Sequence, residues 1–310
     1  MMYADTGNTK TTQLYFFAKW LWEKYRLKTR LISGDGGGYV PFVDSGMIDE
    51  GITEVFDYNQ SPVAIADMRR ISEGYWPSRQ SNGNYTFTTS PECMTPMQTE
   101  VGRITGWNEI GAYLFDSFTS LCTVLLGHCS DNGNIGFKDS WKYTEDGYTI
   151  HGLQEGHYGI VQKEIHARFN RGVLMLPTRF IVCTALVEKG EDKAKMPFVG
   201  PKGAGRADTP QIPTWFMDVF HLEKIYEEDS VTGVKTQQQV AWFMEHLDSS
   251  GSGAMHKCKP RILPELMPEL LKYFPQGYVK LKYKYGIDSY YTVLEQILKQ
   301  HKQEKEKEER

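Results

Sequence analysis

The sequence predicts an α/β fold in which helices flank a mostly parallel β-sheet. Short apolar segments alternate along the chain with segments of helical periodicity. The strand candidates are nearly continuous apolar runs, which is typical of strands covered on both faces. The chain has 310 residues, 40% of them hydrophobic, enough to bury a sizeable core. Together these observations favour a layered sheet.

The first half of the chain supplies two strands and two helices. Residues 11–25 predict an amphipathic helix, because apolar side chains recur at helical spacing. TRLIS (29–33) and EVFDY (54–58) predict buried strands, and the first of them is followed by GDGGG. Residues 61–76 predict a second helix, with Ser61 as N-cap and Pro62 at its first position.

Further along, residues 77–105 are polar and rich in turn residues, and predict a surface insertion. GAYLFDSFTSL (111–121) predicts an apolar strand that ends in Asp-Ser, and TRFIVCTAL (178–186) predicts another. Between them a helix is predicted over 157–176. Past residue 188 the pattern weakens to short apolar segments and a charged tail, either helical or disordered. The predicted organisation is a core over 1–225 including the insertion, a small irregular C-terminal extension over 226–298 and the tail over 299–310.

Composition excludes several classes of protein. The net charge of -4 gives no global basic field, so binding of nucleic acid requires a local patch. Five cysteines without a C-x-x-C pair argue against a disulfide framework or zinc knuckle and favour a reducing, cytoplasmic setting. No apolar run of membrane-spanning length and no signal peptide is expected.

A candidate phosphate-binding loop opens the chain. Met1 to Tyr3 predict the end of a short strand, Gly7 a turn, and Lys10 and Thr11 the cation and hydroxyl at a helix start. The loop residues expected to contact nucleotide are Asp5, Thr6, Gly7, Asn8, Thr9, Lys10, Thr11 and Thr12. The standard G-x-x-x-x-G-K-[ST] pattern has glycines where Ala4 and Thr9 stand, and Thr9 could crowd the phosphates. Taken alone, the stretch is equally typical of a capped helix start.

Asp116, in AYLFDS, is the second candidate. Nucleotide-binding proteins with a phosphate loop hold magnesium with an acidic residue at the end of an apolar strand. Solvated aspartates at strand ends are also common in α/β proteins. The order of a Lys-Thr turn and then a strand-end Asp favours nucleotide binding, with ATP and Mg²⁺ as cofactors and Thr11 and Asp116 as the magnesium residues.

The sequence of motifs resembles the RecA-type ATPases, and within them the phage-encoded single-strand-annealing recombinases of the Sak group and related phage ATP-binding proteins. The resemblance covers most of residues 1–225, and implies a RecA-like P-loop fold. The residues that carry it are ADTGNTKTT (4–12), LISGDGG (31–37), YLFDSFTSL (113–121), the run HYGIVQKEIHARFNRGVLMLPTRFIVCTALVEKGED (157–192) and VGPKGAGRADTPQIPTWFMDVFHL (199–222).

The resemblance implies catalytic roles. Asp35 matches the carboxylate that activates the attacking water, although it is one methylene shorter than the usual Glu. Thr184 matches the polar sensor of the γ-phosphate. Lys257 and Lys259 resemble the paired lysines that reach a neighbouring subunit's nucleotide in rings or filaments. The alternative for Asp35 is a polar turn residue, and that for Thr184 is a strand hydroxyl hydrogen-bonded within the protein. For the two lysines the alternative is a solvated basic turn.

Two loops, 130–157 and 189–206, are candidates for contacting nucleic acid. The second carries basic residues suited to phosphate contacts, and a flexible solvated loop is the alternative. These residues are Lys189, Lys193, Lys195, Lys202 and Arg206. A separate group of four histidines (His128, His151, His157 and His166) with Cys129 fits no ligand spacing, so no metal other than magnesium is predicted.

The expected function is therefore a Mg-ATP-binding, RecA-like ATPase acting on single-stranded DNA in phage recombination or replication. The resemblance places it in the cytoplasm of an infected host, as a homo-oligomer that works with single-stranded DNA and a single-strand-binding protein. Two alternatives stay open. One is a P-loop motor or assembly factor acting on protein, and the other is a nucleotide-binding module with little hydrolysis, favoured by Thr9 and Asp35.

Overall fold

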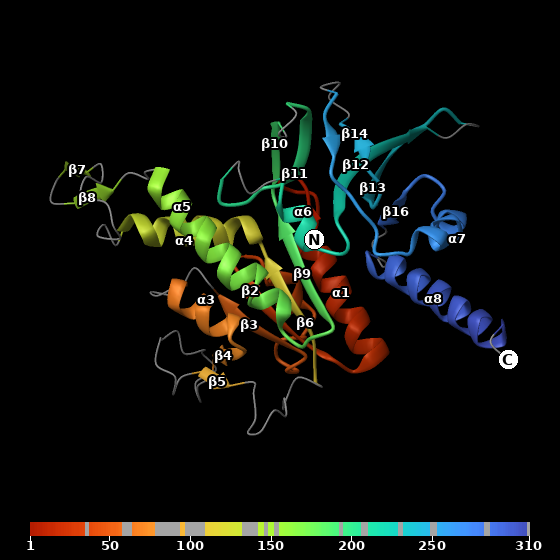
Figure 1. The fold of residues 1–310 in the computed structure, drawn as a ribbon, viewed down its shortest axis with the longest axis horizontal. Helices are drawn as coiled ribbons and strands as arrows, with labels where there is room; N and C mark the ends of the chain where they lie inside the picture. The colour runs from red at the N-terminus through yellow and green to blue at the C-terminus, as the bar shows by residue number, and fades with distance from the viewer. Residues whose placement is uncertain are drawn as a thin grey trace. The chain divides into compact units, whose positions relative to one another are not determined.

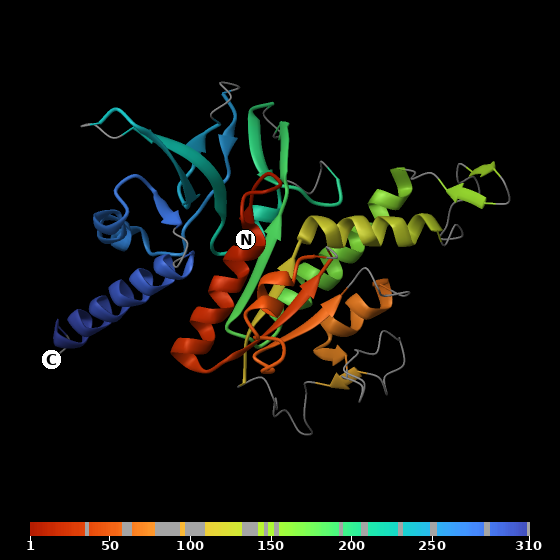
Figure 2. The same ribbon diagram turned by 180° about the vertical axis from the view of Figure 1, so that it is seen from behind.

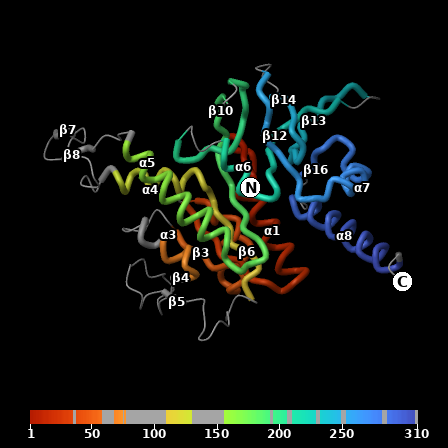
Figure 3. The backbone as a smooth tube through the Cα atoms, in the orientation of Figure 1, coloured from red at the N-terminus to blue at the C-terminus, as the bar shows by residue number. Residues whose placement is uncertain are grey.

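The computed structural model describes most of the chain in two compact units. The first comprises residues 1–20, 186–201 and 210–310, and the second 21–185 and 202–209. The described residues are 1–34, 37–57, 64–77, 94–96, 109–131, 142–145, 148–151, 155–191, 195–205, 210–228, 232–248, 253–281 and 286–308. Figure 3 traces the backbone of the chain as a tube.

The second unit contains a parallel sheet, so the predicted α/β class with a mostly parallel sheet is confirmed. Its strands follow the order β9-β6-β2-β3, and each neighbouring pair is parallel. The strand bounds are β2 (Lys28–Ser33), β3 (Thr53–Asp57), β6 (Ile110–Asp116) and β9 (Phe180–Ala185). Every residue of β6 is buried, which explains its unbroken apolar sequence.

Helices of the second unit gather on one side of this sheet (Figures 1 and 2). They are α3 (Ala64–Ser72), α4 (Phe118–Asp131) and α5 (Glu155–Glu164), which continues as a π-helix (Ile165–Asn170) before a 3-10 turn (Val173–Met175). A short helix, α2 (Val40–Asp44), follows β2. Phe169 packs edge-on against Phe115 and Phe118, at 5.0 and 4.9 Å between ring centroids. These aromatic contacts join the helices to the strand β6.

Of two further predicted elements, one is confirmed and one is wrong in part. The strand predicted to end in Asp-Ser within 111–121 ends at Asp116, and helix α4 starts at Phe118. The Ser117 hydroxyl accepts the Ser120 backbone N–H at 3.1 Å and caps that helix. The predicted helix over 61–76 ends at Ser72, where Gly74 takes a φ of 91° and the strand β4 (Tyr75–Pro77) follows. Ser61 and Pro62 lie outside the described residues.

Two small hairpins complete the second unit. Strand β4 pairs with β5 (Met94–Pro96) inside the predicted insertion, and β7 (Lys142–Glu145) pairs with β8 (Tyr148–His151) inside the candidate loop 130–157. Both pairs are antiparallel. Within these two segments, residues 78–93, 97–105, 132–141, 146–147 and 152–154 lie outside the described residues.

The first unit has a mixed sheet of order β16-β13-β12-β1. Its strands are β1 (Met2–Tyr3), β12 (Phe220–Glu228), β13 (Lys235–Trp242) and β16 (Tyr278–Leu281). Only β1 and β12 are parallel to each other; the later pairs are antiparallel. The short apolar segments past residue 188 therefore form strands of this sheet.

Helix α1 (Lys10–Tyr25) begins in the first unit and confirms the predicted amphipathic helix. Helices α7 (Met267–Tyr273) and α8 (Asp288–Glu308) lie near the chain's C-terminus, so the charged tail is helical as far as residue 308. Tyr290 of α8 packs against Phe220 and Phe243, with ring centroids 5.0 and 5.5 Å apart. This aromatic cluster forms the core beside β12.

A second, four-stranded sheet of the first unit has the order β10-β11-β15-β14. Its strands are β10 (Val187–Glu191), β11 (Pro197–Pro201), β14 (His246–Leu247) and β15 (Met255–His256), and the short helix α6 (Ile212–Trp215) contacts β11. A 3-10 turn (Pro264–Leu266) precedes α7. The antiparallel strands β10 and β11 take up much of the candidate loop 189–206. Among the described residues, no helix combines the length and apolar character needed to cross a membrane.

Candidate functional site

Residues 4–9 form a turn between the buried strand β1 and helix α1. Tyr3 and Ala4 are fully buried, and the Met1 amino group donates to the Asp218 carbonyl at 2.8 Å. Gly7 adopts a φ of 81°, a left-handed conformation that glycine takes without steric cost. The Gln13 N–H donates to the Thr9 carbonyl at 3.0 Å as the helix begins. The sequence thus folds locally as a strand, a tight turn and a helix.

Lys10 closes this turn on itself. Its Nζ donates to the carbonyls of Ala4 and Asp5 at 3.1 and 2.9 Å. The ammonium group is therefore held beside the turn, at the N-terminus of a helix of 16 residues. The first amides of a helix lack partners within it, and the helix dipole adds partial positive charge there. Lysine and helix end together can bind an anion such as a phosphate.

Thr9, the residue before the lysine, has a φ of 55°. A β-branched residue in this region is a conformational outlier, because its Cβ approaches the neighbouring carbonyl. The position that carries glycine in the standard pattern thus has a left-handed backbone here, although its side chain is Thr.

Replacing Thr9 with Gly is expected to stabilise the protein by roughly 1 kcal/mol, because glycine removes the steric cost of the left-handed backbone. Urea unfolding of the two proteins measures this. The control is Thr12→Gly, inside helix α1, which should destabilise by a similar amount. Equal loss of stability in both variants would contradict the account of Thr9.

In the second unit, Asp116 and Thr184 come together. Asp116 is the last residue of β6 and only 2% exposed. The Thr184 hydroxyl, on the neighbouring strand β9, lies 2.6 Å from Asp116 Oδ1 and 3.2 Å from the Phe115 carbonyl. The Asp116 carbonyl accepts the Gly34 N–H at 2.7 Å, which joins the ends of β2 and β6.

These contacts fix the carboxylate at the carboxyl edge of the parallel sheet. Ligands of open α/β sheets bind at this edge, and carboxylate oxygens are preferred by Mg²⁺. The Thr184 hydroxyl is satisfied within the protein, as its alternative interpretation expected, so its role as phosphate sensor stays a prediction. Lys10 and Thr11 belong to the first unit and Asp116 to the second. Their predicted shared magnesium site likewise stays a prediction.

The remaining predicted residues lie in several places. Lys257 pairs with Glu245 at 3.6 Å between Nζ and Oε1. Lys259 forms an antiparallel backbone bridge with Val219, and burial lowers the pKa of its side chain. The role of the two lysines at a neighbouring subunit's nucleotide stays a prediction. Asp35, Lys193 and Arg206 lie outside the described residues.

Of the candidate DNA-binding lysines, Lys189 is on strand β10 and forms an ion pair with Asp248 at 3.0 Å. Lys195 has a φ of 60° shortly before β11. Lys202, in the second unit, accepts the Thr119 hydroxyl through its carbonyl at 2.8 Å. Lys189 and Lys195 thus belong to the first unit, and Lys202 belongs to the second.

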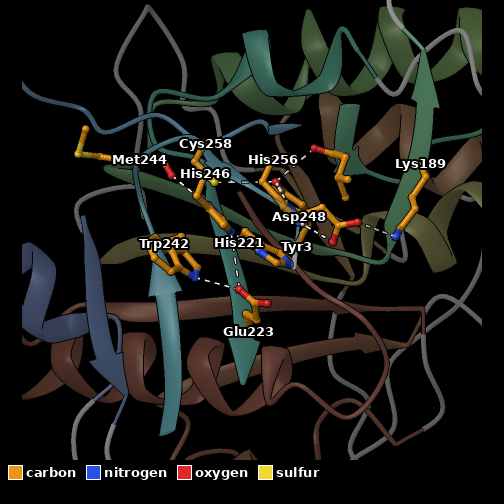
Figure 4. Close-up of polar contacts among 11 residues, drawn as sticks. Tyr3, Lys189, His221, Glu223, Trp242, Met244, His246, Asp248, His256 and Cys258 are labelled. Carbon is orange, nitrogen blue, oxygen red and sulfur yellow. Dashed lines mark hydrogen bonds and ion pairs between the residues drawn. The ribbon is translucent and has the colours of Figure 1, made fainter. Parts of the chain in front are cut away.

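The structure also gathers three histidines that the sequence did not single out. His221, His246 and His256 lie in the first unit, and each places one ligand nitrogen within 4.8 Å of the others (Figure 4). His246 and His256 flank a Ser/Gly-rich stretch and face each other across the antiparallel pair β14–β15. The spacing of His246 and His256 around this stretch could have predicted from the sequence that the two are close. The approach of His221, on β12, depends on the tertiary fold.

Neither a scan against protein-family models nor a search of curated proteins finds a match. Six solved chains match. One is the crystal structure of the flagellar accessory protein FlaH from Methanocaldococcus jannaschii, which is 8% identical, covers 78% of this chain and 75% of that chain, and has a TM-score of 0.31. At this TM-score the likeness carries no argument about function.

Proposed function

We propose that this chain is a Mg-ATP-binding, RecA-like P-loop ATPase. The observation that carries the proposal is the turn between β1 and α1, in which Lys10 Nζ contacts the carbonyls of Ala4 and Asp5 at 3.1 and 2.9 Å. A lysine held beside a helix N-terminus suits the β- and γ-phosphates of a nucleotide. Thr11, the next residue, supplies a hydroxyl of the type that contacts magnesium.

Asp116 supports the same proposal from the second unit. It is a buried carboxylate at the end of a parallel strand, positioned by Thr184 at 2.6 Å. Its oxygen donors suit magnesium, and it follows the Lys-Thr turn in the order usual for P-loop enzymes. We propose Thr11 and Asp116 as the magnesium residues, and Asp35 as the base that orients water.

The proposed substrate partner is single-stranded DNA, in phage recombination or replication. The support is the resemblance to the phage-encoded single-strand-annealing recombinases, together with the lysines of the segment 189–206, of which Lys189 and Lys195 lie in or beside the antiparallel pair β10–β11. Neutralisation of backbone phosphates by lysine releases counterions, so the proposed binding weakens as salt rises.

The full chain is expected to release phosphate from ATP only with Mg²⁺, and faster when single-stranded DNA is added. Asp116→Asn should lose this turnover but stay folded, because the asparagine oxygen can still accept the Thr184 hydroxyl. Phosphate release, circular dichroism and retention on single-stranded DNA at two salt concentrations measure this. Wild-type turnover in Asp116→Asn would contradict the site, and a rate indifferent to DNA would contradict the partner.

Thr9 favours a second candidate, a module that binds ATP and hydrolyses it little. Its side chain stands where P-loop enzymes have glycine, close to the expected phosphates, with a φ of 55°. Bound ATP that persists without phosphate release selects this module. Recovery of turnover in Thr9→Gly would attribute the low rate to that side chain.

A further inference from the structure

Three imidazole rings of the first unit converge from three strands. His221 is on β12, His246 on β14 and His256 on β15 (Figure 4). His221 Nδ1 and His246 Nε2 are 3.1 Å apart. Two ligand nitrogens of a tetrahedral zinc ion, each about 2.0–2.1 Å from the metal, are about 3.3 Å apart. The first pair of nitrogens therefore already has nearly the separation that one ion requires.

Two carboxylates face these rings. Glu223 Oε2 lies 3.7 Å from His246 Nε2 and accepts the Trp242 indole N–H at 3.1 Å. Asp248 Oδ1 lies 3.5 Å from His256 Nε2, and its other oxygen pairs with Lys189. Negative charge beside buried imidazoles favours a cation among them. A carboxylate on the outer nitrogen of a ligating histidine is also a usual support of protein metal sites.

The environment keeps the rings uncharged. Burial, together with the two neighbouring histidines, lowers the pKa of His221 to about 2, and burial, with a smaller effect of His256, lowers that of His246 to about 4. His256 has its pKa lowered by burial as well, against the opposing effect of Asp248. Neutral imidazole is the form that ligates metals.

We propose that His221, His246 and His256 bind one divalent transition-metal ion of the zinc class, with Glu223 as the fourth ligand and Asp248 as the residue that orients His256. Imidazole nitrogens with one carboxylate suit zinc and its first-row neighbours, and do not suit Mg²⁺ or Ca²⁺, which prefer oxygen. The proposed site is thus chemically distinct from any magnesium bound with ATP.

Binding has a structural consequence. The rings of His221 and His256 are stacked with centroids 3.8 Å apart and 19° between planes, and those of His246 and His256 at 4.6 Å and 3°. The lone pair of an imidazole nitrogen lies in the ring plane, so parallel rings do not all aim at one point. The rings must turn when the ion enters, which changes their magnetic environment.

The cluster adjoins the start of the N-terminal turn. The Tyr3 hydroxyl lies 3.4 Å from His256 Nδ1, and the Asp5 carboxylate acts electrostatically on His256. Tyr3 ends β1, directly before the turn that Lys10 closes. Because Asp248 faces His256 Nε2, the nitrogen left to ligate the ion is Nδ1, and the ion would displace the Tyr3 hydroxyl from it.

The test is a titration of the full-length, nucleotide-free protein with Zn²⁺ after metal removal by a chelator. Calorimetry should show one Zn²⁺ per chain, and Co²⁺ should give the intense visible absorption of a tetrahedral site. His246→Ala should weaken Zn²⁺ binding at least about 100-fold and Glu223→Gln about 10–100-fold. His246 is chosen because its side chain, at 12% exposure, is more exposed than that of His256, at 4%.

The matched control is His128→Ala, which removes a histidine of helix α4 and should leave Zn²⁺ affinity unchanged. Nitrogen-15 histidine spectra should show three shifted imidazoles on Zn²⁺ addition. Unchanged affinity in Glu223→Gln and His246→Ala, or a wild-type protein that takes up no Zn²⁺, would overturn the site. If His246→Ala does not fold, Glu223→Gln decides. Lys10→Ala should keep its Zn²⁺ affinity, so failure of the ATP site and failure of this one are distinguishable.

Discussion

Lys10→Ala is expected to lower the affinity for Mg-ATP at least about 100-fold, because it removes a charged donor worth roughly 1.5–3 kcal/mol per phosphate hydrogen bond. The variant should stay folded, since the other contacts of β1 and α1 are unaffected. Calorimetric titration with ATP, ADP and AMP measures the effect. The loss should be largest for ATP and smallest for AMP, because the lysine is expected at the terminal phosphates.

Lys19→Ala is the matched control, an exposed lysine on the same helix α1, and should bind ATP as the wild type does. Wild-type ATP affinity in Lys10→Ala would contradict the assignment of the N-terminal turn. An equal loss for all three nucleotides would attribute the effect to the fold of the turn rather than to phosphate contact.

The largest expected effect on stability comes from Asp218, a buried carboxylate of the first unit. It accepts the Arg261 N–H and the hydroxyls of Tyr290 and Tyr291, the last two at 3.2 and 3.3 Å. Asp218→Ala leaves these donors without their acceptor, at roughly 1–3 kcal/mol for each buried one. We expect a loss of about 3 kcal/mol of unfolding free energy, measured by urea denaturation.

Asp218→Asn should cost less than Asp218→Ala, since it keeps one acceptor oxygen. Asp49→Ala, at an exposed position of the second unit, should change stability by less than about 0.5 kcal/mol. Equal effects of all three substitutions would contradict the role of the buried carboxylate.

The contribution of Asp218 to the free energy of unfolding depends on pH. Burial raises the pKa of Asp218 in the folded protein, against the lowering effects of the Arg261 N–H and the N-terminal amino group. Folding therefore favours the protonated form, and the contribution of Asp218 to stability falls as pH rises from the unfolded pKa through the folded one. Asparagine does not titrate, so the deficit of Asp218→Asn relative to wild type should grow as pH falls towards about 4.

Several elements of the fold follow from local sequence. The strands β2, β3 and β9 were predictable because continuous apolar runs are stable only when both faces of a strand are covered. Helix α1 was predictable from its 3.6-residue periodicity. The strand in 111–121 was predictable as far as its Asp-Ser end, but the helix that follows from Phe118 was not, since apolar residues continue through the change from strand to helix. A single hydroxyl, that of Ser117, marks that change.

The candidate site was predictable only in outline. Lys10 and Asp116 are each identified by residue type at the end of a predicted element. The contact of Thr184 with Asp116 depends on the register of β6 and β9, in which Phe115 pairs with Cys183 one residue earlier. Every residue of β6 is buried, so this strand has no polar face that would fix which residues of β9 pair with it.

The sequence by itself determined the alternation of strands and helices, the turn closed by Lys10 and the placement of Asp116 at a strand end, because these depend on neighbours within a few residues. Only the tertiary structure decided that His221 meets His246 and His256, that Asp218 accepts two tyrosine hydroxyls of α8, and that the late apolar segments form a sheet with β1. These contacts join residues far apart in the chain, and strand register rather than local pattern brings them together.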